Sequence, residues 1–183
     1  TPVVYTTNKF TFTTHALTSK IKLVSDLMNR VPNMVTNSDF SNGTTGWTSY
    51  GATSTVSNGN LFNTSNGTET YGVIFQDDIP LVDTLYVFTK SRVTNSLANQ
   101  LRIRTSNASI QAVQSNPVNG QWYFLSAIGI TTVARLEVSH QYADTATANG
   151  KIMEVDYIGA FNITTFKKAG VVNDSGTLFS RLT

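Results

Sequence analysis

The run Leu101-Arg102-Ile103-Arg104 alternates apolar and basic side chains. Successive residues of a β-strand point to opposite faces, so Arg102 and Arg104 share the face that meets solvent or ligand. A guanidinium group can form paired hydrogen bonds with hydroxyls, a phosphate or a carboxylate. The alternative is a solvated face on which these arginines pair across strands with Glu137 or Asp78.

Aromatic side chains are the second group suited to binding, because flat rings offer apolar surface to a ligand beside planar polar groups that can hydrogen-bond to it. Most large aromatic residues pack in cores, so each has a structural alternative. Tyr50 and Tyr142 lie in turn-rich surroundings that favour ligand contact. His140 is in phase with apolar neighbours and more often belongs to the edge of a core. The candidate ligand-binding residues are Tyr50, Tyr71, Arg102, Arg104, Trp122, His140 and Tyr142.

No convincing catalytic set emerges from two histidines and eleven acidic residues. The sequence contains no Gly-x-Ser-x-Gly elbow, no His-Glu-x-x-His metal helix and no phosphate-binding loop. Glu154 and Asp156 stand two residues apart on one predicted strand and could imitate a glycosidase pair. Their apolar neighbours favour a structural role, so we predict that the chain is not an enzyme.

Composition excludes several other classes of function. The 13 basic and 11 acidic residues are scattered and give a net charge of +2, so no basic patch for nucleic acid is expected. No apolar run reaches the roughly 20 residues that span a membrane. The absence of cysteine excludes a disulfide framework, a Cys-ligated zinc site and a thiol nucleophile.

The chain divides near Pro32. Residues 14–30 carry Leu17, Ile21, Val24 and Met28 at helical spacing, and residues 1–32 have a net charge of +3. We predict an attachment segment with a possible helix there, a β-domain over 33–166 and a C-terminal extension over 167–183.

Asn-Gly pairs, which suit tight turns, separate short runs rich in β-branched and aromatic residues after residue 33. This pattern predicts an all-β antiparallel sandwich. The predicted strands are Thr53–Val56, Tyr71–Ile79, Thr84–Val93, Gln100–Thr105, Trp122–Ile130, Ala134–Gln141 and Lys151–Ile163.

Three motifs in this order resemble carbohydrate-binding modules of the family 4/9 group, which have a galactose-binding-like jelly roll. The opening motif is Asn33-Met34-Val35-Thr36-Asn37-Ser38-Asp39-Phe40 followed by Gly46-Trp47. Gly120-Gln121-Trp122-Tyr123 resembles the opening of a central strand, and Val155-Asp156-Tyr157-Ile158-Gly159 resembles the closing strand. Residues 158–166 are similar to the tail of such modules in bacteriophage structural proteins.

The resemblance implies a sandwich of two sheets that binds sugar on its concave face or loop rim, often with a structural calcium ion. Asp39 and Asp156 match the calcium-associated positions. The sequence departs from the family at Ser38, Ser41 and Tyr157, so backbone carbonyls would have to supply most of the six to eight oxygen ligands.

The function implied is a non-catalytic module of a phage tail or baseplate protein in the virion. It would adhere to host cell-wall polysaccharide and contact other tail proteins through residues 1–32. The alternatives are a purely structural assembly module of the tail, or a binding module of a bacterial polysaccharide-degrading enzyme.

Overall fold

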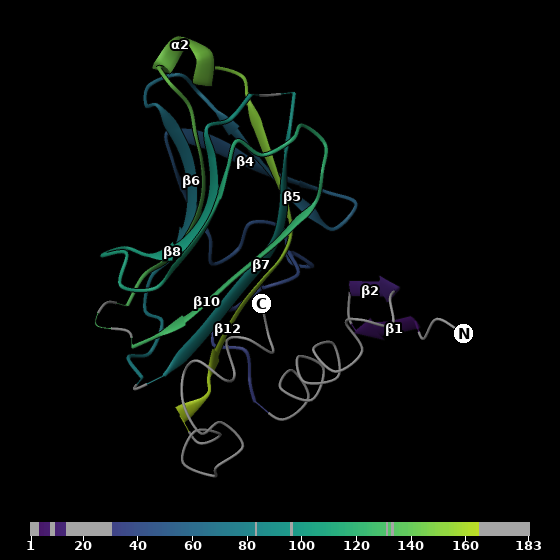
Figure 1. Ribbon diagram of the computed structural model, residues 1–183, viewed down its shortest axis with the longest axis vertical. Helices are drawn as coiled ribbons and strands as arrows, with labels where there is room; N and C mark the ends of the chain where they lie inside the picture. Colours follow the sequence, from purple (N-terminus) through teal and green to yellow (C-terminus); the bar gives the residue numbers. More distant parts are fainter. Residues whose placement is uncertain are drawn as a thin grey trace.

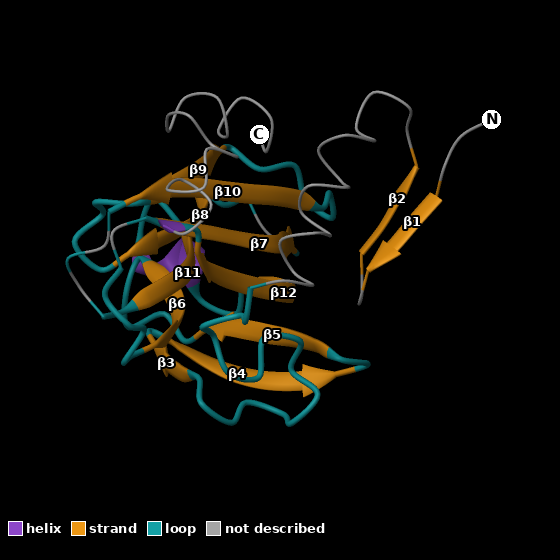
Figure 2. Cartoon of the chain, turned by 90° about the horizontal axis from the view of Figure 1, so that it is seen from below, coloured by secondary structure: helices purple, strands orange, loops and turns teal. Residues whose placement is uncertain are grey.

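Two five-stranded antiparallel sheets form a β-sandwich in the computed structural model (Figure 1, Figure 2), which confirms the predicted fold class. The structure describes residues 4–7, 10–13, 31–82, 84–95, 97–130, 132 and 134–164. Sheet I has the order β3-β6-β11-β8-β9 and sheet II the order β10-β7-β12-β5-β4. The strands of sheet I are β3 (Thr48–Tyr50), β6 (Tyr71–Gln76), β11 (Leu136–Gln141), β8 (Gln100–Thr105) and β9 (Gln111–Ser115). Those of sheet II are β10 (Tyr123–Gly129), β7 (Leu85–Thr94), β12 (Ile152–Asn162), β5 (Asn60–Ser65) and β4 (Ala52–Ser57).

Each predicted strand corresponds to an observed one, and β8 has the predicted bounds. Strands β3, β5 and β9 were not predicted, because their residues are mostly polar. The short helix α2 (Thr145–Ala148) and a separate antiparallel pair, β1 (Val4–Thr7) with β2 (Phe10–Thr13), were not predicted either. The helix predicted within residues 14–30 and the extension 167–183 lie outside the described residues. Among the described residues, no helix has the length and apolar character that crossing a bilayer requires.

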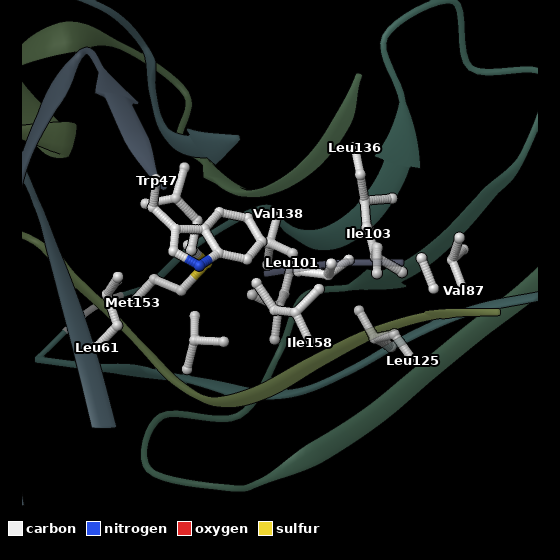
Figure 3. Close-up of a cluster of buried hydrophobic side chains, with 14 of the residues drawn as sticks. Trp47, Leu61, Val87, Leu101, Ile103, Leu125, Leu136, Val138, Met153 and Ile158 are labelled. Carbon is white, nitrogen blue, oxygen red and sulfur yellow. The ribbon is translucent and has the colours of Figure 1, made fainter. Parts of the chain in front are cut away.

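The core lies between the sheets, where alternate residues of β8 and β11 point inward (Figure 3). Leu101 and Ile103 of β8 meet apolar side chains from sheet II, and Trp47 of the opening motif packs at one end of the cluster. Burying a side chain of this size contributes about 1.5–3 kcal/mol relative to leaving it exposed. The alternation that fills the core also fixes which residues face outward.

The opening motif lies outside the strands and is held by side-chain amides together with two main-chain hydrogen bonds to β12, from the Met34 amide to the Ala160 carbonyl at 2.8 Å and from the Ile158 amide to the Ser38 carbonyl at 3.1 Å. Asn33 donates to the Ile158 carbonyl at 3.2 Å and accepts from the Ala160 amide at 2.9 Å, which ties the start of the domain to β12. Gln76 of β6 accepts from the Thr36 amide at 2.9 Å. These bonds satisfy backbone groups that lack a strand partner, and they lead the chain into β3.

A buried polar bridge connects the two sheets. His140 of β11 is fully buried, and its Nε2 lies 3.2 Å from Oδ1 of Asn63 on β5. Because that oxygen can only accept, Nε2 carries the proton, and Nδ1 accepts from the Tyr142 hydroxyl at 2.7 Å. Gly72 leaves room for this contact, since a Cβ there would collide with His140, Asn63 and Ser65. Burial lowers the pKa of His140 from 6.5 to about 3.

This depressed pKa predicts that the fold loses stability in acid. Below pH 6.5 the unfolded chain binds a proton that folded His140 does not bind until about pH 3. Stability therefore falls as the pH falls through this window, by roughly 1.4 kcal/mol per unit, and this group contributes no pH dependence above it. Chemical denaturation at a series of pH values would measure the slope.

His140→Gln is the matched variant, because it removes the titrating group and keeps a polar side chain. We expect a shallower loss of unfolding free energy between pH 6.5 and 4.5 than the roughly 3 kcal/mol that His140 contributes in the native protein. Equal slopes in the two proteins would contradict the assignment.

Candidate functional site

The outer face of sheet I carries a pocket of about 280 Å³ built from cross-strand rows. In one row Tyr50 pairs with Val73, Val73 with Ser139, and Ser139 with Arg102. In the next row Phe75, Glu137 and Arg104 follow one another across β6, β11 and β8. The lining residues are Tyr50, Tyr71, Val73, Phe75, Arg102, Arg104, Arg135, Glu137 and Ser139.

Aromatic rings form one wall of the pocket. The ring centroids of Tyr50 and Tyr71 lie 6.0 Å apart at an interplanar angle of 36°, and Tyr50 is 51% exposed. Its hydroxyl donates to Oε1 of Glu69 at 2.7 Å, and this bond raises the pKa of Tyr50. The tyrosines thus present apolar ring surface beside fixed polar groups.

Three arginines line the pocket, and they differ in their partners. Arg104 donates to Glu137 at 2.8 Å, which is the cross-strand pair considered as the alternative from the sequence. Arg135 makes two hydrogen bonds with Asp77, at 2.7 and 3.2 Å, and its guanidinium carbon lies 4.1 Å from the centroid of Phe75.

Arg102 has a hydroxyl rather than a carboxylate as its partner. Its Nε donates to Oγ of Ser139 at 2.9 Å. Burial lowers the pKa of Arg102, and the positive charge of Arg104 lowers it further. Asp78, the second acidic partner considered from the sequence, forms no ion pair within the described residues.

The structure brings four of the seven predicted ligand-binding residues together in this pocket: Tyr50, Tyr71, Arg102 and Arg104. The other three lie elsewhere. Trp122 precedes β10 in sheet II, where the guanidinium carbon of Arg92 lies 4.5 Å from its ring centroid. His140 and Tyr142 belong to the buried polar bridge and are 0% and 2% exposed, so neither ring reaches the surface.

Five residues that line the pocket were not among the predicted ligand-binding residues. They are Val73 and Phe75 of β6, Glu137 and Ser139 of β11, and Arg135 just before β11. The signal for β11 was present, since Arg135, Glu137 and Ser139 alternate with apolar residues as the arginines of β8 do. Placing β11 beside β8 would have brought both outward rows together. That pairing joins residues more than thirty positions apart, and turn patterns do not reveal it.

The two carboxylates predicted to hold calcium have other partners. Asp156 accepts from Lys90 at 2.7 Å, and Asp39 accepts from the Ser41 hydroxyl at 2.8 Å. In the described part of the chain no group of three or more His, Asp or Glu side chains could hold a metal ion. The carboxylates around these positions therefore do not form a calcium cage, and bound calcium stays a prediction that depends on backbone carbonyls.

Glu154 and Asp156, the pair compared with glycosidase carboxylates, lie on sheet II and are nearly buried. Glu154 accepts from Arg92 at 2.6 Å and from Asn60 at 2.7 Å. Asp156 is paired with Lys90, and a β-bulge between Val155 and Tyr157 interrupts the strand alternation between them. Both carboxylates thus form hydrogen-bonded ion pairs with cations of β7.

Comparisons with known proteins identify the fold. No protein-family description and no curated sequence matches the chain. The family 61 carbohydrate-binding module TmCBM61, solved with β-1,4-galactotriose, superposes with a TM-score of 0.50 at 12% identity, over 71% of this chain and 98% of that module. The chain has the jelly-roll fold of carbohydrate-binding modules. Identity this low establishes the fold and not the ligand.

Two further structures are similar to the chain. A sialidase superposes with a TM-score of 0.51 at 12% identity, and the match covers 70% of this chain but 18% of the sialidase. A CBM4 structure gives a TM-score of 0.49 at 10% identity, over 69% of this chain and 98% of the module. The chain therefore spans less than a fifth of the sialidase but nearly all of each binding module.

The two carboxylates that pair with pocket arginines, Glu137 and Asp77, are predicted to contribute unequally to stability. Glu137→Gln leaves Arg104 without a counter-charge beside Arg102, in a pair whose carboxylate side chain is only 11% exposed. We expect a loss of about 1–2 kcal/mol in the free energy of unfolding. Chemical denaturation near neutral pH would measure it.

Asp77→Asn is the matched control, because it removes the same charge from the more exposed pair with Arg135. Its expected cost is under about 1 kcal/mol. A Glu137→Gln variant as stable as Asp77→Asn would show that the Arg104 pair is no more valuable than a surface pair.

Proposed function

We propose that this chain is a non-catalytic carbohydrate-binding module that binds its saccharide in the pocket of sheet I. The proposal is supported by one observation: aromatic rings and guanidinium groups line the same pocket on the outer face of sheet I. Tyr50 and Tyr71 offer flat apolar surface to a pyranose ring, and Arg102 and Ser139 offer planar and hydroxyl hydrogen-bonding groups. Convergent polar groups in a partly apolar hollow are typical of small-ligand sites.

The composition of the pocket supports a binding role rather than a catalytic one. Glycoside hydrolysis commonly requires two carboxyl groups on either side of the scissile bond. Glu137 is the one carboxylate that lines the described pocket, and Arg104 holds it as an ion pair. A single carboxylate held by an arginine does not provide the pair of groups that this reaction uses, so the pocket is suited to binding.

The setting we propose is a bacteriophage tail or baseplate, in which the module helps the virion adhere to host cell-wall polysaccharide. This finer assignment depends on the resemblance of residues 158–166 to the tails of phage modules. Residues 1–32, with a net charge of +3, would attach the module to other tail proteins.

A second setting is a binding module within a bacterial polysaccharide-degrading enzyme. This setting is favoured by the similarity to a sialidase, because the region that matches this chain is only 18% of that longer enzyme. Retention of the protein on purified walls of candidate host strains favours the phage setting. Retention on soluble or plant-type polysaccharides alone favours the enzyme setting.

Loss of an aromatic ring from the pocket is the direct test of the binding site. We expect Tyr71→Ala to weaken binding to the best saccharide of a glycan panel by about ten-fold or more, since a ring contact of about 1.4 kcal/mol corresponds to that factor. Isothermal titration calorimetry of the folded variants would measure the affinity.

Trp122→Ala is the informative comparison, because it removes an aromatic ring from the sheet II side of the sandwich. We expect it to bind within a factor of about two of the native chain. Binding that is lost in Trp122→Ala and kept in Tyr71→Ala would move the site to sheet II, and no binding to any saccharide or wall preparation would overturn the proposed function.

A further inference from the structure

The pocket of sheet I carries an excess of positive charge that can be assigned to a single residue. Arg104 is neutralised by Glu137 at 2.8 Å, and Arg135 by Asp77 at 2.7 Å. The remaining arginine, Arg102, forms no ion pair within the described residues. The unbalanced charge therefore lies on β8, opposite Ser139, in the row that begins with Tyr50.

The guanidinium of Arg102 has hydrogen-bond donors that its one contact, with Ser139, does not use. Its Nε–H is used by the Ser139 hydroxyl at 2.9 Å, which fixes the plane of the group. A guanidinium has five N–H donors, and the four on its terminal nitrogens have no partner among the described residues. A carboxylate or phosphate oxygen pair matches such a fork.

The location of Arg102 also disfavours a purely neutral ligand. The side chain is already partly desolvated on β8, between the core residues Leu101 and Ile103. A neutral saccharide that fills the pocket removes more water from this charge and returns no opposite charge, which costs free energy. An anionic group supplies both the counter-charge and the acceptors.

We propose that the saccharide bound here carries an anionic group, and that Arg102 binds that group while Tyr50 and Tyr71 hold a sugar ring. The inference rests on the proposed function and specifies its substrate class. The shared chemistry is an anionic oxygen pair on a glycan, which a uronic or sialic acid provides as a carboxylate and a wall polymer as a phosphodiester.

The experiment is a binding panel of matched pairs. Each acidic glycan is presented with a neutral counterpart: uronate oligosaccharides with their methyl esters, sialylated glycans with their desialylated forms, and phosphodiester-linked wall glycans with dephosphorylated repeats. We expect at least one acidic member to bind ten-fold or more tightly than its counterpart. The carboxylate and phosphate arms identify the source of the anion.

Arg102→Gln tests the residue assigned to the anion. On the best acidic ligand we expect it to lose most of the preference for the acidic member over its neutral counterpart, measured as the ratio of the two dissociation constants. Lys151→Gln makes the same charge change outside the pocket lining and should leave the preference intact. Arg102→Lys keeps the charge but loses the fork, and should retain an intermediate preference.

Thermal unfolding shows whether each variant is folded. If Arg102→Gln does not fold, the affinities of the native chain are measured at rising ionic strength. Screening should weaken binding to the acidic member and leave binding to the neutral member unchanged, so the preference falls.

The outcomes separate the two proposals. Tight binding to neutral members alone, or a preference that survives in folded Arg102→Gln, overturns the anionic class and leaves the binding function standing. Binding to no member of the panel overturns the binding function and the inference together. A preference that does not change with ionic strength also contradicts an anion held by Arg102.

Discussion

The strict alternation of strand β11, held between β6 and β8, is the constraint on which the site depends. Leu136, Val138 and His140 face the interior, so Glu137 and Ser139 between them must face outward. The register then places Glu137 opposite Arg104 and Ser139 opposite Arg102. A slip of one residue would exchange the two faces and bury the charges. The free energy of core packing thus fixes the geometry of the pocket.

The interior and the pocket are coupled through β6. Gly72 has no side chain, and this allows His140 of sheet I to reach Asn63 of sheet II. Its neighbours Tyr71 and Val73 line the pocket on the other face of the same strand. The polar bridge that joins the sheets therefore also holds the backbone beneath the aromatic wall. Such support lowers the cost of ordering side chains when a ligand binds.

The sequence predicts the fold where apolar residues alternate, as in β8, whose bounds were predicted correctly. It fails for β5, because the inward residue Asn63 is polar and meets its partner His140 from 77 positions away. The polar neighbourhood of Tyr142 predicted a surface position, but its hydroxyl donates to His140, two residues away, in the interior. The outward position of Arg102 could be predicted from the alternation of apolar and basic residues in β8. Its lack of a carboxylate partner could not, because that depends on which strands are neighbours in the sheet.

The outer faces of the two sheets differ in how many side-chain groups remain able to contact a ligand. On sheet II, Arg92 is bound by Glu154 and its guanidinium covers Trp122, so a ligand there would have to displace existing contacts. Phe88 lies flat among neighbouring rings over Gly159, where a Cβ would collide with it. On sheet I, Tyr50 remains half exposed and Arg102 keeps open donors. A ligand gains binding free energy from side chains that are already ordered and still have exposed apolar surface or unused hydrogen-bond donors. The outer face of sheet I offers both.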